Sequence, residues 1–128
     1  MKLLLDTHVA LWTVTDDPRL SRAARKLVAD FTHEKCVSIV SLWEIGLKRA
    51  SKPSRIPLTS ARAILLFEQA GFEHVPLEPE HVTAFEAVPL LHGDPFDRMI
   101  VAQALHENLR LVTHDEAVAG YSNTFLLV

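Results

Sequence analysis

Residues 1–14, MKLLLDTHVALWTV, join a short apolar run to a stretch that favours a helix. Lys2–Leu5 has the length and composition of a buried strand, and Asp6 follows it directly. Thr7–Val14 is predicted to be a helix that ends in the turn formed by residues 15–18, TDDP. A buried strand that leads at once into a helix is typical of α/β proteins, so this stretch sets the class of fold that the remaining chain must match.

The same alternation recurs along the sequence. Its predicted strands are Cys36–Val40, Phe72–Val75, Leu111–Thr113 and Phe125–Val128. Its predicted helices are Ser21–Phe31, Ser41–Ala50, Thr59–Ala70, Pro79–Ala87 and Asp94–Asn108, with a helical turn at Glu116–Ala119. Strands separated by helices form a mostly parallel sheet. Since 128 residues fit one domain, we expect a single α/β domain over residues 1–128.

Composition narrows the class of protein further. Apolar residues make up 48% of the chain, enough for a sizeable core. The apolar run at the start is too short for a signal peptide or a membrane span, and the single Cys36 excludes an intramolecular disulfide framework. We therefore expect a cytoplasmic protein without membrane contact. The 13 Lys and Arg against 16 Asp and Glu give a net charge of −3, which at first argues against a nucleic-acid partner.

Acidic residues follow two of the predicted strands. Asp6 comes after the first strand, and Asp115 comes shortly after Leu111–Thr113. Each one alone is most simply the N-cap of the next helix. Two acids at the carboxyl ends of strands in one parallel sheet would, however, face the same crevice, where such sheets bind ligands.

The segment GDPFDRMIVAQA, residues 93–104, adds two more acids. Pro95 suits the first helical position, which makes Asp94 the N-cap. At about 100° per residue, Asp97 lies in line with Val101 and Ala104 on the apolar face of this helix, where an unpaired charge is costly. This favours Asp97 as a functional residue and Asp94 mainly as a cap, with a direct role for Asp94 as the minor alternative.

Glu44 allows two interpretations. It lies on the polar side of the predicted helix Ser41–Ala50, four residues before Lys48, so periodicity alone predicts a surface ion pair. It also falls in the first turn after a buried strand, from which it can reach the crevice. Carboxylates gathered there would repel one another and raise their pKa values, and a divalent cation would relieve this. Oxygen ligands select Mg²⁺ or Mn²⁺, which predicts metal-dependent phosphodiester hydrolysis.

Four segments in order, LLLDTHVALW, SLWEIGLKRA, GDPFDRMIVAQAL and LVTHDEAVAGY, resemble the PIN-domain family, specifically its VapC-type ribonuclease toxins of type II toxin–antitoxin modules. The resemblance implies a three-layer α/β/α sandwich. It also implies an acidic quartet that binds Mg²⁺ or Mn²⁺, formed by Asp6, Glu44, Asp97 and Asp115. Asp94 matches a recurrent supporting acid, and Thr7 and Thr113 match small polar positions that orient carboxylates or water.

The resemblance further implies partners. The substrate would be single-stranded or structured RNA, cut endonucleolytically. A cognate antitoxin would insert a C-terminal segment across the active site, in a homodimer or a toxin–antitoxin hetero-oligomer. Removing the quartet from the charge count leaves 12 acids against 13 bases, so the net acidity is largely local to the predicted metal site.

Several Lys and Arg residues allow two interpretations, and three histidines are candidates for an indirect role. Lys48, Arg49, Lys52 and Arg55 are either a solvated helix end or contacts to RNA phosphates, and Arg98 beside Asp97 is a similar candidate. His8, His92 and His114 lie near proposed acids, where we expect at most an indirect role.

Helix Thr59–Ala70 is apolar nearly all round, which predicts contact with a partner protein. Trp12 and Trp43 are expected in the core or at such an interface.

Two other functions remain open from the residues alone. Phosphotransfer or phosphatase chemistry with Asp6 as the nucleophile also places an Asp after a first strand, but it needs a second acid beside Asp6 or a suitably placed lysine, which the sequence does not supply. A non-catalytic binding module would use the acids only as helix caps.

Overall fold

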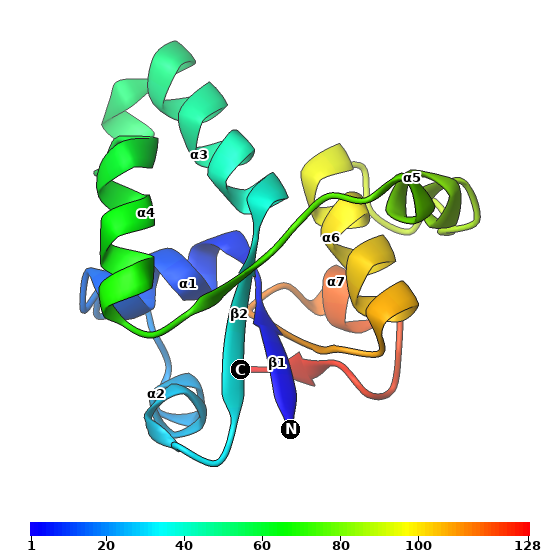
Figure 1. Ribbon diagram of the computed structural model, residues 1–128, viewed down its shortest axis with the longest axis horizontal. Helices are drawn as coiled ribbons and strands as arrows, with labels where there is room; N and C mark the ends of the chain where they lie inside the picture. Colours follow the sequence, from blue (N-terminus) through cyan, green and yellow to red (C-terminus); the bar gives the residue numbers. More distant parts are fainter.

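The computed structural model describes all 128 residues as a five-stranded sheet with helices on both faces (Figure 1). The strands are β1 (Lys2–Leu5), β2 (Glu34–Ser38), β3 (Glu73–Val75), β4 (Arg110–Thr113) and β5 (Leu126–Leu127). The helices are α1 (Thr7–Val14), α2 (Arg22–Ala29), α3 (Ile39–Ser51), α4 (Ser60–Gln69), α5 (Pro79–Glu86), α6 (Pro95–Glu107) and α7 (Glu116–Ala119), with a 3₁₀ turn, η1 (Pro53–Arg55), after α3.

The sheet is entirely parallel, with the strand order β3-β2-β1-β4-β5. Strand β1 lies at its centre, where Leu5 pairs with Val37 of β2 and with Val112 of β4. The chain extends from β1 to β3 on one side and then crosses to β4 on the other side. The gap between β1 and β4 is therefore the point where the strand order reverses, and the carboxyl ends of both strands open toward it.

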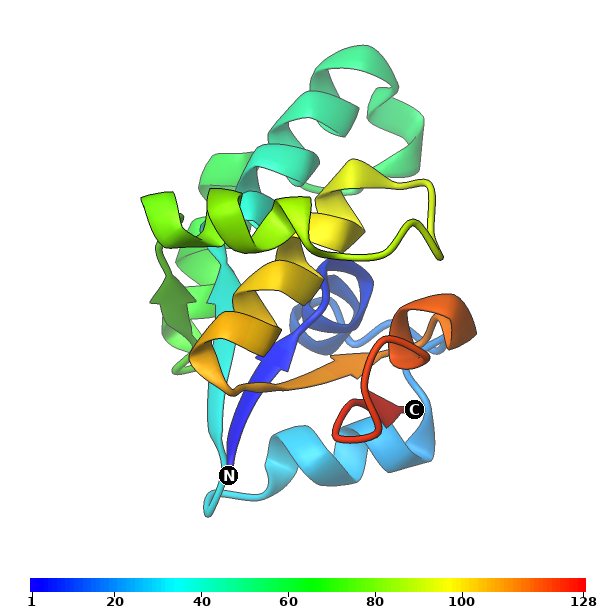
Figure 2. The ribbon, with the colours of Figure 1, turned by 90° about the vertical axis from the view of Figure 1, so that its right-hand side faces the viewer.

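The sheet separates two apolar cores. Leu3 and Leu5 of β1 belong to the core beneath α1, α2 and α4, while Leu4 belongs to the core beneath α5, α6 and α7. Figures 1 and 2 show these helices as two layers with the sheet between them. Burial on both faces explains why KLLL is continuously apolar, and it confirms the predicted three-layer α/β/α architecture.

Some predicted boundaries are wrong. The strand predicted for Cys36–Val40 ends at Ser38, because the Ser38 hydroxyl accepts the amide N–H of Val40 (2.9 Å) and starts α3 two residues early. Helix α2 ends at Ala29, since the Asp30 carboxylate accepts the amide N–H of Thr32 (2.9 Å) and forms a turn. Phe31, predicted within that helix, is therefore outside it and 98% exposed. The turn η1 was not predicted.

Helix α4 is covered only on one side by its own chain. Ala63 and Phe67 are fully buried against the first core, whereas Leu65 is 44% exposed. Contact with a partner protein at α4 stays a prediction. None of the helices is both long enough and apolar enough to span a membrane.

Gln103 provides a test of the fold, because this fully buried amide joins three elements. It accepts a hydrogen bond from the Ser38 hydroxyl at the end of β2 and donates one to the Pro76 carbonyl after β3 (3.2 Å). We expect Gln103→Ala to lower the free energy of unfolding by about 1–3 kcal/mol, because both partners lose their hydrogen bonds in a buried site. Urea unfolding measures the loss. Gln69→Ala, at an exposed position, is the control, and an equal effect of the two substitutions would contradict this role.

Candidate active site

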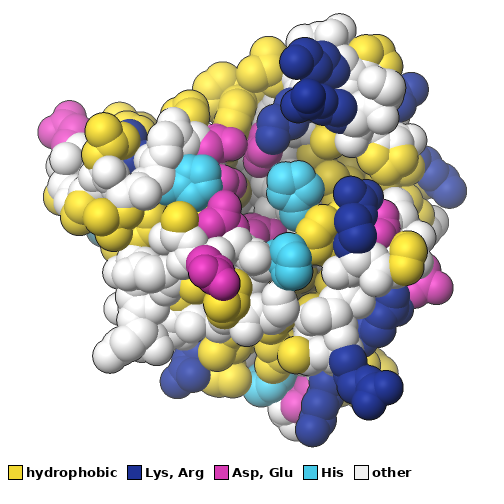
Figure 3. Space-filling view, turned by 180° about the vertical axis from the view of Figure 1, so that it is seen from behind, with side chains coloured by type: hydrophobic (Ala, Val, Ile, Leu, Met, Phe, Trp, Pro, Cys, Tyr) yellow, Lys and Arg dark blue, Asp and Glu magenta, His cyan; other side chains and the backbone are white.

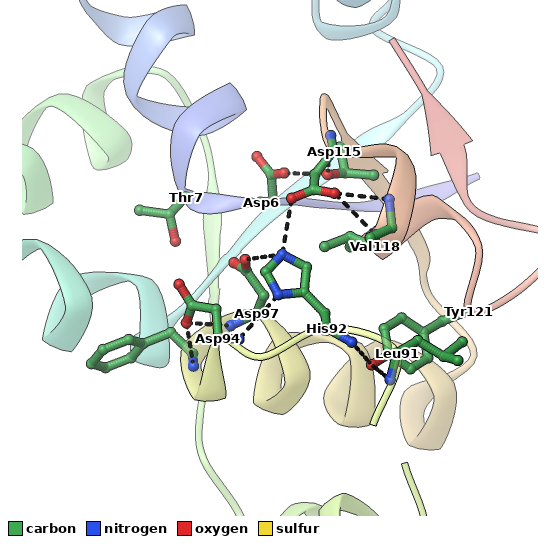
Figure 4. Close-up of polar contacts among 12 residues, drawn as sticks. Asp6, Thr7, Leu91, His92, Asp94, Asp97, Asp115, Val118 and Tyr121 are labelled. Carbon is green, nitrogen blue, oxygen red and sulfur yellow. Dashed lines mark hydrogen bonds and ion pairs between the residues drawn. The ribbon is translucent and has the colours of Figure 1, made fainter. Parts of the chain in front are cut away.

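Carboxylates from four elements meet where β1 and β4 end. Asp6 caps α1, Glu44 lies in α3, Asp94 and Asp97 begin α6, and Asp115 caps α7. Figure 3 shows acidic and histidine side chains gathered in a hollow of the surface, and Figure 4 shows how Asp6, Asp94, Asp97 and Asp115 lie around it. The structure thus brings together the acids that the sequence predicted at this edge of the sheet.

Asp6 both caps a helix and faces the other acids. One of its carboxylate oxygens accepts the amide N–H of Val9 (2.8 Å), and the other accepts the hydroxyl of Thr113 in β4. Asp6 is only 8% exposed, and this burial raises its pKa. The two hydrogen bonds offset the rise only in part. Thr113 therefore holds Asp6 in place, as its predicted orienting role requires.

Glu44 is buried, so its interpretation as a surface residue is wrong. It is only 1% exposed, because it lies on the buried side of α3 with Ser41 and Ile45, whereas the apolar Leu47 is 49% exposed. The Thr7 hydroxyl donates a hydrogen bond to Glu44 Oε1 (2.6 Å), which gives Thr7 an orienting position. The predicted ion pair with Lys48 is present. Burial lowers the pKa of Lys48, but the hydrogen bond and charge of Glu44 more than offset this and raise it overall.

Asp94 and Asp97 have different roles at the start of α6, as the helical periodicity predicts. Asp94 accepts the amide N–H groups of Phe96 (2.8 Å) and Asp97 (3.3 Å), which is the bonding pattern of an N-cap. Asp97 points into the cluster. Burial, followed by the negative charges of Asp94, Glu44 and Asp6, raises the pKa of Asp97 to about 7. The expected repulsion is therefore concentrated on Asp97.

Asp115 behaves differently from the other acids because of His92. Although burial raises the pKa of Asp115, the hydrogen bond from His92 and those from the amides of Val118 and Ala117 lower it overall. His92 Nε2 lies 2.9 Å from Asp115 Oδ2 and 3.3 Å from Asp97 Oδ2. The other ring nitrogen, Nδ1, accepts the amide N–H of Asp94 (3.0 Å), so the proton lies on Nε2 and points at the carboxylates.

His92 is the site residue that sequence analysis underestimated. It belongs to a loop that Tyr121 holds in place: the Tyr121 hydroxyl accepts the amide N–H groups of Leu91 (3.0 Å) and His92 (2.9 Å) and donates to the Pro89 carbonyl (2.7 Å). Its position two residues before the cap Asp94 was a local signal. Its contact with Asp115, 23 positions away, had no signal in the sequence.

Arg98, a predicted supporting residue, lies away from the carboxylates. Its guanidinium donates to the Val88 carbonyl (3.2 Å) and lies over the ring of Phe85, 4.6 Å from the ring centroid. A residue next to Asp97 on a helix points about 100° away from it, which explains the difference.

The ligand atoms fit a hard divalent cation. Glu44, Asp94 and Asp97 offer carboxylate oxygens that lie within 4.8 Å of one another, and Asp97, Asp115 and His92 form a second such group. Asp97 belongs to both groups. Burial and the neighbouring negative charges raise its pKa, and a bound cation would relieve the repulsion among these charges. Oxygen-rich sites of this kind suit Mg²⁺ and Mn²⁺ better than zinc.

Comparisons with known proteins agree with this geometry. The family model of the PIN domain matches residues 3–122, and the chain belongs to the PIN-domain family. Within that family its likeness is to VapC proteins: it is 33% identical over 123 residues to Ribonuclease VapC22 of Mycobacterium tuberculosis, covering 93% of this chain and 91% of the relative.

Solved structures of the same fold include VapBC2 from Rickettsia felis bound to a promoter DNA fragment (TM-score 0.69, 17% identity, 100% of this chain and 98% of that chain). VapBC-1 from nontypeable Haemophilus influenzae is also similar (TM-score 0.64, 15% identity, 100% and 97%). At these identities the two structures support the fold alone.

Asp97 gives a prediction for stability without metal. Its folded-state pKa lies above the usual 3.8, so the contribution of Asp97 to stability is most favourable at low pH and is lost as pH rises from about 4 to about 7. We expect Asp97→Asn to be more stable than the wild type at pH 8 in EDTA, by up to about 4 kcal/mol since each pKa unit is about 1.4 kcal/mol. Urea unfolding at pH 8 and pH 4 measures this gain, which should vanish at pH 4.

The control for this measurement is Glu116→Gln, which removes an exposed carboxylate on α7. It should change stability little at either pH. An Asp97→Asn protein that is no more stable than the wild type at pH 8 would show that repulsion at Asp97 is absent.

Proposed function

We propose that the protein is a Mg²⁺- or Mn²⁺-dependent endoribonuclease and the toxin component of a toxin–antitoxin module. The observation that carries this proposal is the convergence of Asp6, Glu44, Asp97 and Asp115 at the reversal point of a PIN-domain sheet. The relative with 33% identity is named a ribonuclease, and a cluster of carboxylates in a hollow of the surface suits hydrolysis of a phosphodiester (Figure 3).

Each residue of the candidate site has a part in this proposed function. Asp6, Glu44, Asp97 and Asp115 would hold the cation, and when bound it would lower the pKa of a water molecule and offset the charge that develops on the phosphate. Thr113 fixes Asp6, and Thr7 fixes Glu44. His92 donates its Nε2 proton toward Asp115 and Asp97. Asp94 sets the start of α6 and hence the direction in which Asp97 points.

The alternative functions account for fewer of these residues. A binding module explains Asp6, Asp94 and Asp115 as helix caps. It leaves the buried Glu44, and Asp97 with its raised pKa, without a role. Phosphotransfer at Asp6 requires an accessible carboxylate, whereas both oxygens of Asp6 already accept hydrogen bonds in a largely buried position.

An antitoxin protein is the proposed partner. Solved structures with the same fold include VapBC complexes, and one of them is bound to promoter DNA. On this chain, large apolar side chains are exposed on neighbouring helices: Trp43 and Leu47 on α3 and Leu65 on α4. We propose that an antitoxin covers part of this surface in a hetero-oligomer, in line with the partner contact expected for residues 59–70.

RNA cleavage tests the function directly. We expect the purified protein to cut labelled RNA with Mg²⁺ or Mn²⁺ and to stop in EDTA. Asp6→Asn and Asp97→Asn should each reduce cleavage at least about a hundredfold, because each removes a ligand of the cation. Glu116→Gln, which removes an acid outside the cluster, should cleave as the wild type does. Cleavage that persists in EDTA, or in both Asn variants, would refute the mechanism.

Metal binding should depend on pH in the way that Asp97 dictates. Since a ligand carboxylate must lose its proton, and the pKa of Asp97 is about 7, Mn²⁺ affinity should fall about tenfold between pH 8 and pH 6. Calorimetric titration with Mn²⁺ in buffers of different ionisation enthalpy measures both the affinity and the proton released. Equal affinity at the two pH values, without proton release, would show that Asp97 is not a ligand.

A further inference from the structure

A positively charged hollow adjoins the carboxylates where α3 runs into η1. Its volume is about 730 Å³. The residues that line it are His8, Arg19, Lys48, Ser51, Lys52, Ser54, Arg55 and Ile56. Figure 3 shows Lys and Arg side chains gathered above the acidic cluster.

This basic hollow is continuous with the acidic site. His8 and Arg19 also line a second hollow, of about 390 Å³, whose other lining residues include Asp6 and Asp115. Lys48 forms a further link, since its side chain lines the basic hollow while its Nζ binds Glu44. An RNA strand that lies in the basic hollow would therefore pass directly to the carboxylates.

Two of the cations in the hollow have no acidic partner. Arg19 pairs with Asp17 (2.8 Å), and Lys48 pairs with Glu44, but Lys52 and Arg55 take part in no ion pair. The turn that carries them is nevertheless fixed, because Arg49 donates to the Ile56 carbonyl (2.9 Å) and the amide of Arg55 donates to the Lys52 carbonyl (3.0 Å). Exposed cations on a fixed turn are suited to binding an anion.

The other flank of the acidic site has a different character. It is formed by the loop that carries His92, where Leu90 and Leu91 are both exposed. The nearby Arg98 is engaged with Val88 and Phe85. Positive charge therefore flanks the carboxylates mainly on the η1 side, so a polyanion would be held more strongly there than at the loop.

We propose that Lys52 and Arg55, with Lys48 and Ser54 beside them, form a subsite for backbone phosphates of the RNA on one side of the scissile phosphate. This inference rests on the proposed ribonuclease function. The acidic cluster repels RNA, so affinity must come from neighbouring cations, and phosphate contacts position a strand without reading its sequence. A basic groove that follows the backbone is the usual means of holding a single strand.

Binding of RNA by a double variant tests the subsite. In the Asp97→Asn background, which prevents cleavage, Lys52→Ala/Arg55→Ala should weaken binding of a fluorescein-labelled single-stranded RNA of random sequence by about tenfold at low salt. The slope of log affinity against log salt should become shallower by about 1.4, since each phosphate contact on a single strand contributes about 0.7. Fluorescence anisotropy at a series of KCl concentrations gives both values.

Two further variants show whether charge in the hollow is the cause. Arg22→Ala/Lys26→Ala removes the same charge from exposed positions on α2, outside both hollows, and should leave affinity and salt slope within about twofold of the starting protein. Lys52→Arg/Arg55→Lys keeps the charge in place and should retain binding. The Mn²⁺ affinity of Lys52→Ala/Arg55→Ala, measured with Asp97 intact, should equal that of the wild type.

Truncated substrates test the one-sided arrangement. RNA shortened from one end toward the cut should lose cleavage by the wild type, whereas RNA shortened from the other end should not. Lys52→Ala/Arg55→Ala should lose this difference between the two ends. Equal sensitivity of the wild type to both truncations would overturn the one-sided subsite.

The outcomes separate this inference from the function on which it rests. If the wild type cleaves RNA but Lys52→Ala/Arg55→Ala binds it like the α2 control, the subsite is wrong and the ribonuclease assignment stands. The hollow would then fit an acidic segment of a partner protein better than RNA. If the wild type neither binds nor cleaves RNA with Mn²⁺, the proposed function fails and the subsite fails with it.

Discussion

Mutual repulsion among buried carboxylates is the constraint on which the rest of this structure depends. The parallel sheet brings the ends of β1 and β4 together, and α3 and α6 add acids to the same place. The pKa of Asp97 is raised to about 7 by burial and by the negative charges of Asp94, Glu44 and Asp6. A fold built only for stability would avoid this arrangement, because replacing such a charge with a neutral group is favourable. Its presence supports the proposed cation site.

Local sequence rules predicted the parts of the site that depend on one element. Helical periodicity placed Asp97 on the buried face, and cap chemistry identified Asp94. The same rule failed for Glu44, because the buried side of α3 includes Glu44 while the apolar Trp43 and Leu47 are exposed, so the apolar residues do not mark the side that faces the core. Contacts between elements were beyond such rules. The bond from Thr113 to Asp6 and the bridge from His92 to Asp115 join residues far apart in the chain, and only the folded sheet brings them together.

Net charge is a poor guide to the proposed RNA partner because it averages over unlike regions. The value of −3 argued against nucleic acid, yet the acids are concentrated at the ends of β1 and β4, while unpaired cations lie beside them at η1. Because the Debye length is roughly 8 Å at physiological salt, a polyanion responds to each region separately. A divalent cation bound among the carboxylates would offset part of the opposing charge, so the η1 cations would then contribute more to the attraction of a phosphate backbone.

Helix capping and burial together explain why the carboxylates differ in pKa. Asp115 accepts two backbone amides and the His92 proton, and its pKa is lowered, whereas Asp97 accepts no amide and its pKa is raised. Asp6 is also capped, but deeper burial outweighs its hydrogen bonds. The capping acids are held at fixed positions by the backbone, and their charges act on the one aspartate that lacks such support. The caps and the proposed metal centre are therefore one arrangement: the hydrogen bonds that start α1, α6 and α7 also orient the carboxylates around Asp97.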